Sequence, residues 1–505
     1  MNVMMLLEMA AQGFGERVAF VNGDESLTYQ QLFDAAGQAA QHIRNSDCEH
    51  VAMLDVSSLA LPVALFASAW AGKPFVPVNY RLAGAEVDAL LERIQPSLLV
   101  TDQARISSLS GAAEIELMER RAFIEMAREG AGEATADWPM DPEEIAVLLF
   151  TSGTTGAPKA AVLRHRHLVS YMFSTVEFGS AAEDEVALVT VPPYHIAGVI
   201  SVISSVYAGR RVIQLPNFNA RDWLDVARRE RVTTAFVVPT MLAQIVRELE
   251  GQSSAELPHL VAMAYGGGKM PGPVIEQAMS LFPDTEFTQA YGLTETSSTI
   301  CVLLPQDHRA ADVSDDPEVR RRLASVGRPL PGVELQIRDK NGKVLAPGQR
   351  GEIYVRGEQV SGEYVGRGSL LDAEGWFPTR DAGELDEEGY LFLEGRVDDV
   401  IVRGAENMSP GEIEDVLLRH SAVADAGVVG VPDEHWGEAV VAVVVLKAGA
   451  DATGEDLRDW VRNHLRSSRV PQSITFVDEL PYNETGKLLR RSIRLDLAGA
   501  TGTSV

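Results

Sequence analysis

The chain has 505 residues, of which 46% are hydrophobic, and its formal net charge is −28. This length exceeds what one hydrophobic core organises, so at least two globular domains are expected, and the strong negative charge argues against nucleic-acid binding. The two cysteines, Cys48 and Cys301, are too few for a cysteine-based metal cluster and favour a reducing compartment, the cytoplasm.

The N-terminal Met-Met-Leu-Leu segment is predicted to begin an amphipathic helix and not a signal peptide, because Glu8 follows it and no basic leader precedes it. Residues 56–72 and 188–209 carry no charged side chain. Both segments contain proline, whereas a membrane-spanning helix needs about 20 predominantly apolar residues. We therefore expect two buried core segments and no transmembrane segment.

Residues 151–159 read Thr-Ser-Gly-Thr-Thr-Gly-Ala-Pro-Lys. The glycines permit backbone angles at which amide N–H groups turn inward, and hydroxyls and one lysine complete a cradle for phosphate oxygens. A Walker loop is excluded, because the lysine follows Ala157 and Pro158. The alternative is an ordinary surface turn. The predicted triphosphate contacts are Thr151, Ser152, Gly153, Thr154, Thr155, Gly156 and Lys159.

An alternating pattern along the chain predicts an α/β fold. Apolar runs at 145–150, 186–191, 234–238 and 260–264 are typical of buried strands, and 220–231 and 239–250 are typical of helices. Residues 325–395 favour a small β-rich subdomain. After Arg396 the order strand, helix, strand, helix predicts a small α+β domain, with Ser409 and Pro410 beginning its first helix. We expect an N-terminal domain of 1–396 and, after a tight hinge, a C-terminal domain of 397–505.

Further short motifs occur in a specific order along the whole chain. They are Leu-Thr-Tyr-Gln-Gln-Leu at 27–32, Pro-Val-Asn-Tyr-Arg-Leu at 77–82, Pro-Pro-Tyr-His at 192–195, Tyr-Gly-Leu-Thr-Glu at 291–295, Thr-Arg-Asp at 379–381, Gly-Arg-Val-Asp-Asp at 395–399, Glu-Asn-Met-Ser-Pro-Gly-Glu-Ile-Glu at 406–414 and Asn-Glu-Thr-Gly-Lys at 483–487. With them the chain resembles the adenylate-forming superfamily of acyl-CoA synthetases, luciferases and peptide-synthetase adenylation domains. Within it the chain looks like a stand-alone bacterial fatty-acid-type acyl-CoA synthetase.

The resemblance implies a two-step reaction. A carboxylate attacks the α-phosphorus of ATP to form an acyl-adenylate, and the thiol of CoA then takes the acyl group. The family pattern makes Lys487 the catalytic lysine that draws the two anions together, and Glu295 the Mg²⁺ ligand. The alternatives are an exposed lysine near a chain end and a carboxylate that caps a helix after Thr294.

The same resemblance implies the nucleotide contacts. Asp381 and Arg396 match the ribose-binding pair, and Tyr291 matches the residue that stacks on adenine. The remaining predicted ATP contacts are Gly267, Gly268, Gly292 and Thr294. Arg380 departs from the family pattern, which usually has glycine there, and it requires a permissive backbone angle at that turn.

The sequence says less about which carboxylic acid is the substrate. Gly292 stands where acetate-specific relatives carry a tryptophan, so a longer acid is expected, and residues 192–198 contain no acidic side chain to bind an amino-acid ammonium group. We predict a medium or long fatty acid. His195 is predicted either as a gate between the acyl pocket and the adenylate or as a core histidine bonded to a backbone carbonyl.

The resemblance makes Asp398 the hinge of a rotating C-terminal domain, and Gly404, Ala405 and Glu406 part of the channel for the thiol. Ala405 replaces a glycine common in the family, which leaves a separate acyl carrier protein open as the acceptor. Arg458, Arg462 and Arg466 at helical spacing could bind such an acidic carrier, or could be a solvated helix face.

A hypothesis of another class is a catalytically silent nucleotide-binding protein. Such a protein would have lost catalytic groups, yet Lys159, Glu295, Asp381, Arg396 and Lys487 are all present. The sequence leaves the oligomeric state open.

Overall fold

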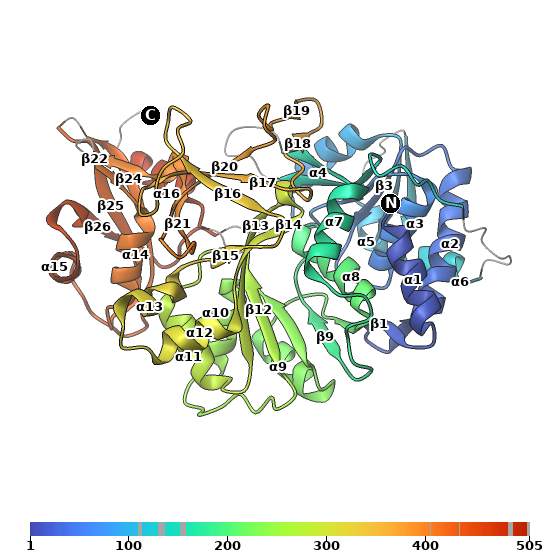
Figure 1. Ribbon diagram of the computed structural model, residues 1–505, viewed down its shortest axis with the longest axis horizontal. Coiled ribbons are helices and arrows are strands. Elements are labelled where there is room, and N and C mark those ends of the chain that lie inside the picture. The colour runs from blue at the N-terminus through green and yellow to red at the C-terminus, as the bar shows by residue number, and fades with distance from the viewer. Residues whose placement is uncertain are drawn as a thin grey trace.

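The structure is a computed structural model, and it describes residues 1–109, 114–129, 137–151, 158–403, 406–433, 435–482 and 488–501. The fold is α/β, as the alternating sequence pattern predicted. Two large mixed sheets with their helices and one small antiparallel sheet make up the N-terminal part, and a smaller α+β unit follows at the C-terminal end (Figure 1).

The largest sheet of the described residues is mainly parallel at its centre and antiparallel at both edges. Its strands, in spatial order, are β15 (Arg328–Pro329), β14 (Ser298–Leu303), β13 (Glu286–Leu293), β12 (Ala262–Gly266), β11 (Thr234–Val237), β9 (Val186–Val189), β10 (Arg211–Gln214), β1 (Val18–Asn22) and β2 (Glu25–Thr28). The runs predicted as strands fall on β9, β11 and β12, with β12 shifted by two residues from the predicted 260–264. The shift arises because Leu260 belongs to a turn in which its N–H donates to the Leu257 carbonyl.

The second large sheet is parallel in one half and antiparallel in the other. Its strands, in spatial order, are β19 (Gly368–Ser369), β18 (Glu363–Tyr364), β8 (Lys159–Arg164), β7 (Ile145–Thr151), β4 (Phe75–Pro77), β3 (His50–Leu54), β5 (Ser97–Thr101) and β6 (Ile115–Glu119). Strand β18 comes from a segment some 200 residues after β8, so residues far apart in the sequence meet at this edge.

The predicted β-rich subdomain forms a small antiparallel sheet. Its strands, in spatial order, are β16 (Glu334–Arg338), β17 (Gly351–Arg356), β20 (Phe377–Leu385) and β21 (Leu391–Arg396). Part of the predicted range, however, contributes strands to the two larger sheets, namely β15, β18 and β19.

The C-terminal unit is α+β as expected, and strands alternate with helices as predicted, but a pair of strands precedes each of the helices Pro410–Leu418 and Gly454–His464 where one strand was predicted. The described strands are β22 (Ile401–Arg403), β23 (Glu406–Met408), β24 (Val423–Asp433), β25 (Gly437–Leu446) and β26 (Ser473–Phe476). Strands β24 and β25 are long valine-rich runs that pair along their whole length, so this hairpin buries apolar side chains of both strands.

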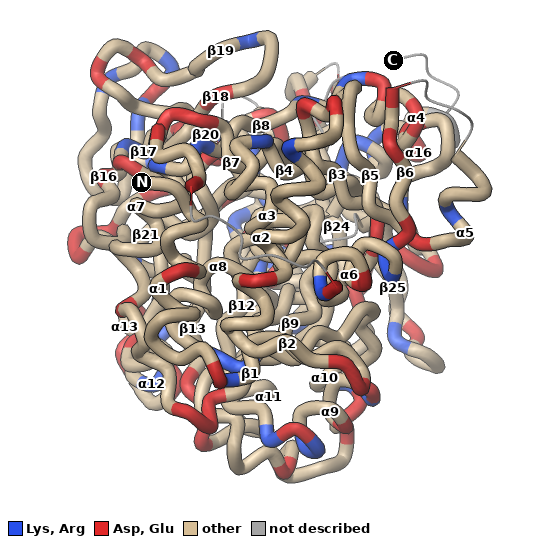
Figure 2. Tube along the Cα trace, turned by 90° about the vertical axis from the view of Figure 1, so that its right-hand side faces the viewer, with Lys and Arg blue, Asp and Glu red and all other residues tan. Residues whose placement is uncertain are grey.

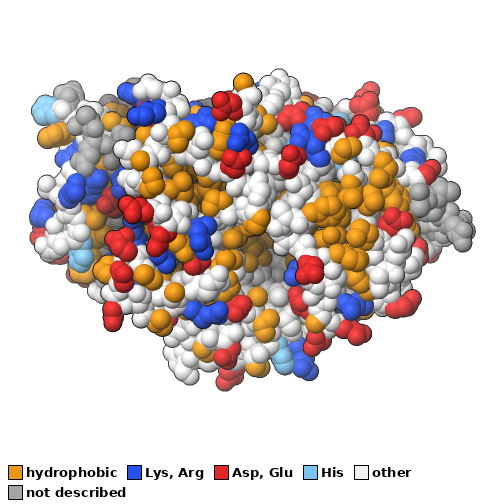
Figure 3. Space-filling model, viewed as in Figure 1, with side chains coloured by type: hydrophobic (Ala, Val, Ile, Leu, Met, Phe, Trp, Pro, Cys, Tyr) orange, Lys and Arg blue, Asp and Glu red, His pale blue; other side chains and the backbone are white. Residues whose placement is uncertain are grey.

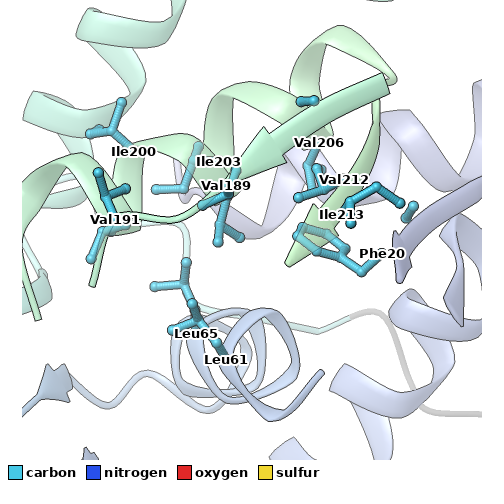
Figure 4. Close-up of a cluster of buried hydrophobic side chains, with 14 of the residues drawn as sticks. Phe20, Leu61, Leu65, Val189, Val191, Ile200, Ile203, Val206, Val212 and Ile213 are labelled. Carbon is cyan, nitrogen blue, oxygen red and sulfur yellow. The ribbon is translucent and has the colours of Figure 1, made fainter. Parts of the chain in front are cut away.

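Helices cover the faces of the large sheets, where the largest hydrophobic cluster contains residues of both sheets and a second cluster packs the helix at 84–91 against the second sheet. In Figure 4, Leu61 and Leu65 of α3 point toward Val189 of β9, and Ile203 of α8 lies on the other side of that strand. The uncharged segment 56–72 contains α3 and 188–209 contains α8, so both are buried core segments as predicted.

The helices of the described residues have these bounds: α1 (Met4–Phe14), α2 (Tyr29–Asn45), α3 (Ala60–Ala71), α4 (Gly84–Leu91), α5 (Gln103–Ile106), α6 (Arg120–Glu129), α7 (His165–Thr175), α8 (Ile196–Ala208), α9 (Ala220–Arg229), α10 (Pro239–Glu248), α11 (Gly272–Leu281), α12 (Pro305–Val313), α13 (Pro317–Arg321), α14 (Pro410–Leu418), α15 (Gly454–His464) and α16 (Arg490–Thr501). None of these helices has the length and apolar character that crossing a membrane requires.

Charged and hydrophobic residues are unevenly distributed over the molecule. Charged residues lie mainly at the periphery of the side view, and the central strands carry few of them (Figure 2). On the face of Figure 3, hydrophobic side chains gather where α7 lies, and Phe173 and Phe178 there are 50% and 37% exposed.

Candidate active site

Three sheets meet at one place and bring together polar side chains from distant parts of the chain. Glu295 follows β13 of the largest sheet, in a short 3-10 turn of Thr294–Thr296. Tyr364 lies in β18 of the second sheet, and Asp381 lies in β20 of the small sheet. Hydrogen bonds join these elements, because Tyr364 contacts Glu295 and Tyr291 of β13 contacts Asp381.

Asp381 is a carboxylate held from two sides. The Tyr291 hydroxyl donates to one oxygen over 2.7 Å, and the Arg396 guanidinium donates to the other over 3.0 Å. Arg396 also donates to the Thr379 carbonyl over 3.1 Å. The predicted ribose pair is therefore in contact, and the carboxylate is oriented by fixed donors.

Arg380 occupies the left-handed turn that the sequence anticipated. Its φ is +64°, a region in which glycine is favoured, so the backbone keeps the turn although the residue is not glycine. The strained arginine immediately precedes Asp381. The turn that presents the carboxylate is thus kept at a conformational cost of order 1 kcal/mol.

Tyr291, the residue predicted to stack on adenine, lies in β13 and contacts Asp381. Its ring belongs to a buried cluster with Ile300 and Cys301, and burial followed by the Asp381 charge raises the pKa of its hydroxyl well above the usual value. The hydroxyl therefore stays protonated as a donor to Asp381. Its stacking on adenine stays a prediction.

Glu295 is held through both its main chain and its side chain. The N–H groups of Ser361 and Gly362 donate to its carbonyl oxygen over 2.8 and 3.2 Å, and the Tyr364 hydroxyl donates to carboxylate oxygen Oε1. Burial and the Glu295 charge raise the pKa of Tyr364, so that hydroxyl keeps its proton. The 3-10 turn has Leu293 at its N-cap, so Glu295 is not the helix cap considered as the alternative.

The predicted phosphate loop connects two antiparallel strands. Thr151 ends β7 and Lys159 begins β8, and the two residues pair across the hairpin. This confirms that the loop does not lead from a strand into a helix as a Walker loop does. Ser152, Gly153, Thr154, Thr155 and Gly156 lie outside the described residues. The Lys159 ammonium lies 5.8 Å from the centre of the Tyr364 ring.

A glycine-rich turn follows β12. Gly267 has a φ of +83°, which requires glycine, and a Cβ atom on Gly266 would lie 2.2 Å from the Ala290 carbonyl oxygen of the next strand. The sequence analysis named Gly267 and Gly268 and missed Gly266, which permits the close approach of β12 and β13. Gly266 begins the Gly-Gly-Gly run, and this position was the feature of the sequence that could have identified it.

Gly292 has a local structural reason that the sequence did not reveal. A Cβ atom there would lie 1.7 Å from the Ser298 carbonyl oxygen, where the pairing of β13 and β14 shifts register. Glycine thus permits this bulge, and Thr294 begins the turn that follows. The expectation that Gly292 also opens the acyl pocket stays a prediction.

His195 lies at the N-terminus of α8, after Pro192 and Pro193. Burial lowers its pKa to about 4, and Arg81 acts in the same direction, so the ring is neutral near pH 7. Its Nε2 atom is buried and has no hydrogen-bond partner among the described residues. The alternative of a core histidine bonded to a backbone carbonyl is therefore not supported at Nε2, and the gate role stays a prediction.

Several predicted residues lie in the C-terminal unit. Lys487, Gly404 and Ala405 lie outside the described residues, and Glu406 is described as the first residue of β23 without its side chain. Asp398 is exposed in a 3-10 turn of Val397–Asp399, directly after β21. This turn lies between the small sheet and β22, and the hinge role of Asp398 stays a prediction.

Two contacts join the C-terminal unit to the N-terminal part near this turn. Ser409 stands at the N-cap of α14 and Pro410 begins that helix, as predicted, and the Ser409 hydroxyl donates to the Glu394 carbonyl over 2.7 Å instead of making a cap bond. Lys269 donates to the Gly411 carbonyl over 2.9 Å and to the Asp415 carboxylate over 2.8 Å. Lys269 had no recognisable signal in the sequence, because only the fold brings its loop to α14.

The predicted arginine stripe is not continuous. Helix α15 ends at His464, so Arg466 is not on it. Arg458 and Arg462 pair with Glu455 and Asp459 of their own helix. This arrangement corresponds to the solvated helix face that was the alternative.

The described donor set is consistent with a metal–nucleotide complex. Magnesium in phosphate sites takes one or two carboxylates and keeps waters, and Glu295 offers one carboxylate oxygen that makes no hydrogen bond to the described residues. Asp381 offers acceptors for ribose hydroxyls. The described residues contain no cluster of three or more metal-ligating side chains, which this kind of site does not need.

Two family models match consecutive parts of the chain. The model described as AMP-binding enzyme matches residues 7–365, and the model described as AMP-binding enzyme C-terminal domain matches residues 412–487. The chain belongs to the AMP-binding enzyme family. The expected membership of the adenylate-forming group is thereby confirmed.

Relatives of this AMP-binding enzyme span nearly its whole length. It is 33% identical over 483 residues to a fatty acid–[acyl-carrier-protein] ligase, ScoC, of Streptomyces coeruleorubidus, covering 93% of this chain and 91% of that one. It is 32% identical to a 2-succinylbenzoate–CoA ligase of Bacillus mycoides, covering 95% of each chain.

A solved structure of o-succinylbenzoate coenzyme A synthetase from Bacillus subtilis, in complex with ATP and magnesium ion, has a TM-score of 0.83 to this AMP-binding enzyme. The two chains are 29% identical, and the match covers 96% of this chain and 98% of the other. The likeness supports the α/β architecture across both parts of the molecule.

Proposed function

We propose that the chain activates a carboxylic acid with ATP to form an acyl-adenylate and then transfers the acyl group to the thiol of CoA. The acid proposed is a medium or long fatty acid. The observation that carries the proposal is the junction of three sheets at which Glu295, Asp381 and Arg396 meet, close to the strand that begins with Lys159.

Each residue at this junction has a proposed task. Asp381, oriented by Tyr291 and Arg396, accepts hydrogen bonds from ribose hydroxyls. Lys159 offsets phosphate charge, and Glu295 would hold Mg²⁺, which would supply further positive charge to neutralise the phosphates. Lys487 is proposed to bring the acid and the α-phosphate together.

The choice of acid rests on relatives and on the absence of acidic residues at 192–198. The ScoC relative is named for a fatty acid, and the Bacillus mycoides relative for 2-succinylbenzoate. An aromatic carboxylic acid is therefore the second candidate.

The choice of CoA as acceptor rests on charge. A net charge of −28 disfavours an acidic carrier protein, and two of the three arginines proposed to meet it are paired within α15. A carrier protein remains the second candidate acceptor, because the ScoC relative is named as an acyl-carrier-protein ligase.

The test is acid-dependent exchange of pyrophosphate into ATP, with short, medium, long and aromatic acids, followed by thioester assays with CoA and with a holo carrier protein. We expect exchange with medium or long fatty acids and thioester formation with CoA. If none of the acids supports pyrophosphate exchange, the proposed function is contradicted. Adenylate formation with saturating CoA but no thioester would contradict the proposed acceptor.

A further inference from the structure

Tyr364 touches both sides of the proposed nucleotide site, although no sequence pattern singled it out. Its hydroxyl donates to Oε1 of Glu295, and the Lys159 ammonium lies 5.8 Å from the centre of its ring. The side chain is 9% exposed. One tyrosine thus contacts the proposed metal ligand with its polar end and the proposed phosphate-binding cation with its ring face.

The backbone fixes Tyr364 relative to both partners. Strand β18 pairs with β8 at Tyr364 and Ala161, two residues after Lys159. Just before Tyr364, the N–H groups of Ser361 and Gly362 both donate to the Glu295 carbonyl. The distances from the tyrosine to Lys159 and to Glu295 are therefore set by main-chain bonds, so the side-chain contacts are preorganised.

Two opposite charges lie beside Tyr364. Its hydroxyl donates to Glu295 and its ring lies near the Lys159 ammonium, and no ion pair between Lys159 and Glu295 is found among the described residues. A direct pair would use the charges that phosphate and metal require. The tyrosine donates to one carboxylate oxygen, and the described residues leave the other oxygen without a hydrogen bond.

We propose that Tyr364 is a positioning residue, which orients the Glu295 carboxylate for the metal of a metal–ATP complex and keeps Lys159 apart from it. This inference rests on the proposed function, because it assumes that the site binds ATP with a divalent metal. Partners that orient a metal ligand typically contribute roughly 10- to 100-fold to metal affinity, although they do not touch the metal.

The test is the Tyr364→Phe variant, which removes the hydroxyl and keeps the ring beside Lys159. Binding of Mn²⁺ in the presence of ATP is measured by the loss of the free Mn²⁺ paramagnetic resonance signal, which needs no turnover. We expect the apparent dissociation constant for Mn²⁺ to rise about tenfold. We also expect the Mg²⁺ midpoint of acid-dependent pyrophosphate exchange to move in the same direction, with a wild-type thermal midpoint.

Tyr390→Phe is the matched control. The Tyr390 hydroxyl donates to the Asp307 carboxylate over 2.8 Å, so the variant deletes the same kind of bond elsewhere in the fold. It should leave Mn²⁺ binding at the wild-type value. Glu295→Gln removes the proposed carboxylate ligand. This variant gives the apparent dissociation constant for Mn²⁺ of a site that lacks the carboxylate.

Two outcomes would overturn the role of Tyr364. One is wild-type Mn²⁺ binding by Tyr364→Phe. The other is an equal loss of ATP binding with and without metal together with a lowered thermal midpoint, which is the effect of a structural tyrosine. Failure of the wild-type protein to bind Mn²⁺ with ATP, or to exchange pyrophosphate with any acid, would instead contradict the proposed function.

Discussion

Asp381 and Glu295 are both carboxylates at the same junction, but their partners differ. Asp381 accepts from a charged guanidinium and a tyrosine hydroxyl, which use both of its oxygens. Glu295 accepts from one tyrosine hydroxyl and has no salt-bridge partner among the described residues. A carboxylate that keeps an oxygen available suits a metal, and one with two fixed donors suits neutral hydroxyls.

Substitution of the single residue Lys487 tests the proposed catalytic step. Lys487→Ala should fold normally and lose acyl-adenylate formation by roughly a hundredfold or more, because removing one transition-state charge contact costs about 3 kcal/mol. Acid-dependent pyrophosphate exchange measures the effect, and Lys340→Ala on an exposed turn is the control. Exchange at the wild-type rate in Lys487→Ala would exclude the role.

Two buried histidines make stability depend on pH. Burial lowers the pKa of His165 to about 4 and that of His167 to about 3. The unfolded chain binds these protons first, near the ordinary value of 6.5, so the stabilisation present above that pH is lost as the pH falls toward the folded-state values. Each histidine lowers the free energy of unfolding by about 1.4 kcal/mol per pH unit in that window.

His167→Asn should therefore flatten the pH dependence. The wild-type protein should lose about 2 kcal/mol more than this variant between pH 6.5 and pH 5, as measured by denaturant unfolding. In the wild-type protein the Arg164 backbone N–H donates to His167 Nδ1 over 3.1 Å. The asparagine side chain keeps an acceptor for this hydrogen bond. Parallel pH profiles for the two proteins would show that His167 does not titrate on unfolding in this window.

At the scale of elements, the site depends on strands that approach each other without side chains between them. Gly266 lies against β13, and Gly292 lies against the Ser298 backbone of β14. These contacts place Tyr291 and the turn that carries Glu295 beside the small sheet. The glycines are therefore part of the geometry of the site, although they carry no chemistry.

Gly292→Ala should destabilise the protein by roughly 2 kcal/mol or more, because a Cβ atom would lie 1.7 Å from the Ser298 carbonyl oxygen and the strands would have to separate. Gly272→Ala is the control, since that Cβ atom would meet nothing within 4 Å and the change should be neutral or stabilising by about 0.5 kcal/mol. Thermal or denaturant unfolding measures both. Equal stability of the two variants would show that the bulge tolerates a side chain.

In the whole molecule, Lys269 and Ser409 make side-chain hydrogen bonds that join the C-terminal unit to the N-terminal part. Helix α14 lies against β21, next to the turn that contains Asp398 (Figure 1). Lys269 connects the glycine-rich turn after β12 to this helix. Lys269 thus links the C-terminal unit to the turn that contains Gly267 and Gly268, two of the predicted ATP contacts.

Lys269→Ala should change the two half-reactions by different factors, because its contacts with Gly411 and Asp415 stabilise one domain orientation. A partly exposed ion pair contributes up to about 1 kcal/mol, so we expect a change of roughly threefold to fivefold in one half-reaction. Pyrophosphate exchange and thioester formation from preformed adenylate measure the two steps. The same factor in both, or no change in either, would argue against this link.

Asp398→Pro should restrict rotation at the hinge, because proline fixes φ and removes a donor. Adenylate formation should persist while thioester formation from preformed adenylate is lost. Single-turnover assays of each step separate these outcomes. Equal loss of both steps would contradict rotation about this residue.

Local patterns of apolar residues, glycines and short ordered motifs were sufficient to predict the α/β class, the family and the motif residues. The permissive backbone angle at Arg380 was also predicted, whereas the hydrogen bond between Asp381 and Arg396 became visible only in the fold. It did not predict the C-terminal hairpins, since long valine-rich strands pair according to non-local burial and not local pattern.

Only the tertiary structure decided which residues support the site. Tyr364, Gly266 and Lys269 act through partners that lie 69, 24 and 146 residues away in the chain, at Glu295, Ala290 and Asp415. The Tyr364 hydroxyl, the absent side chain of Gly266 and the Lys269 ammonium contribute to the site only in the folded chain. There, strands of three sheets and a helix of the C-terminal unit come together. The physical reason is that contacts across sheets follow from packing, whereas a motif records only neighbours in sequence.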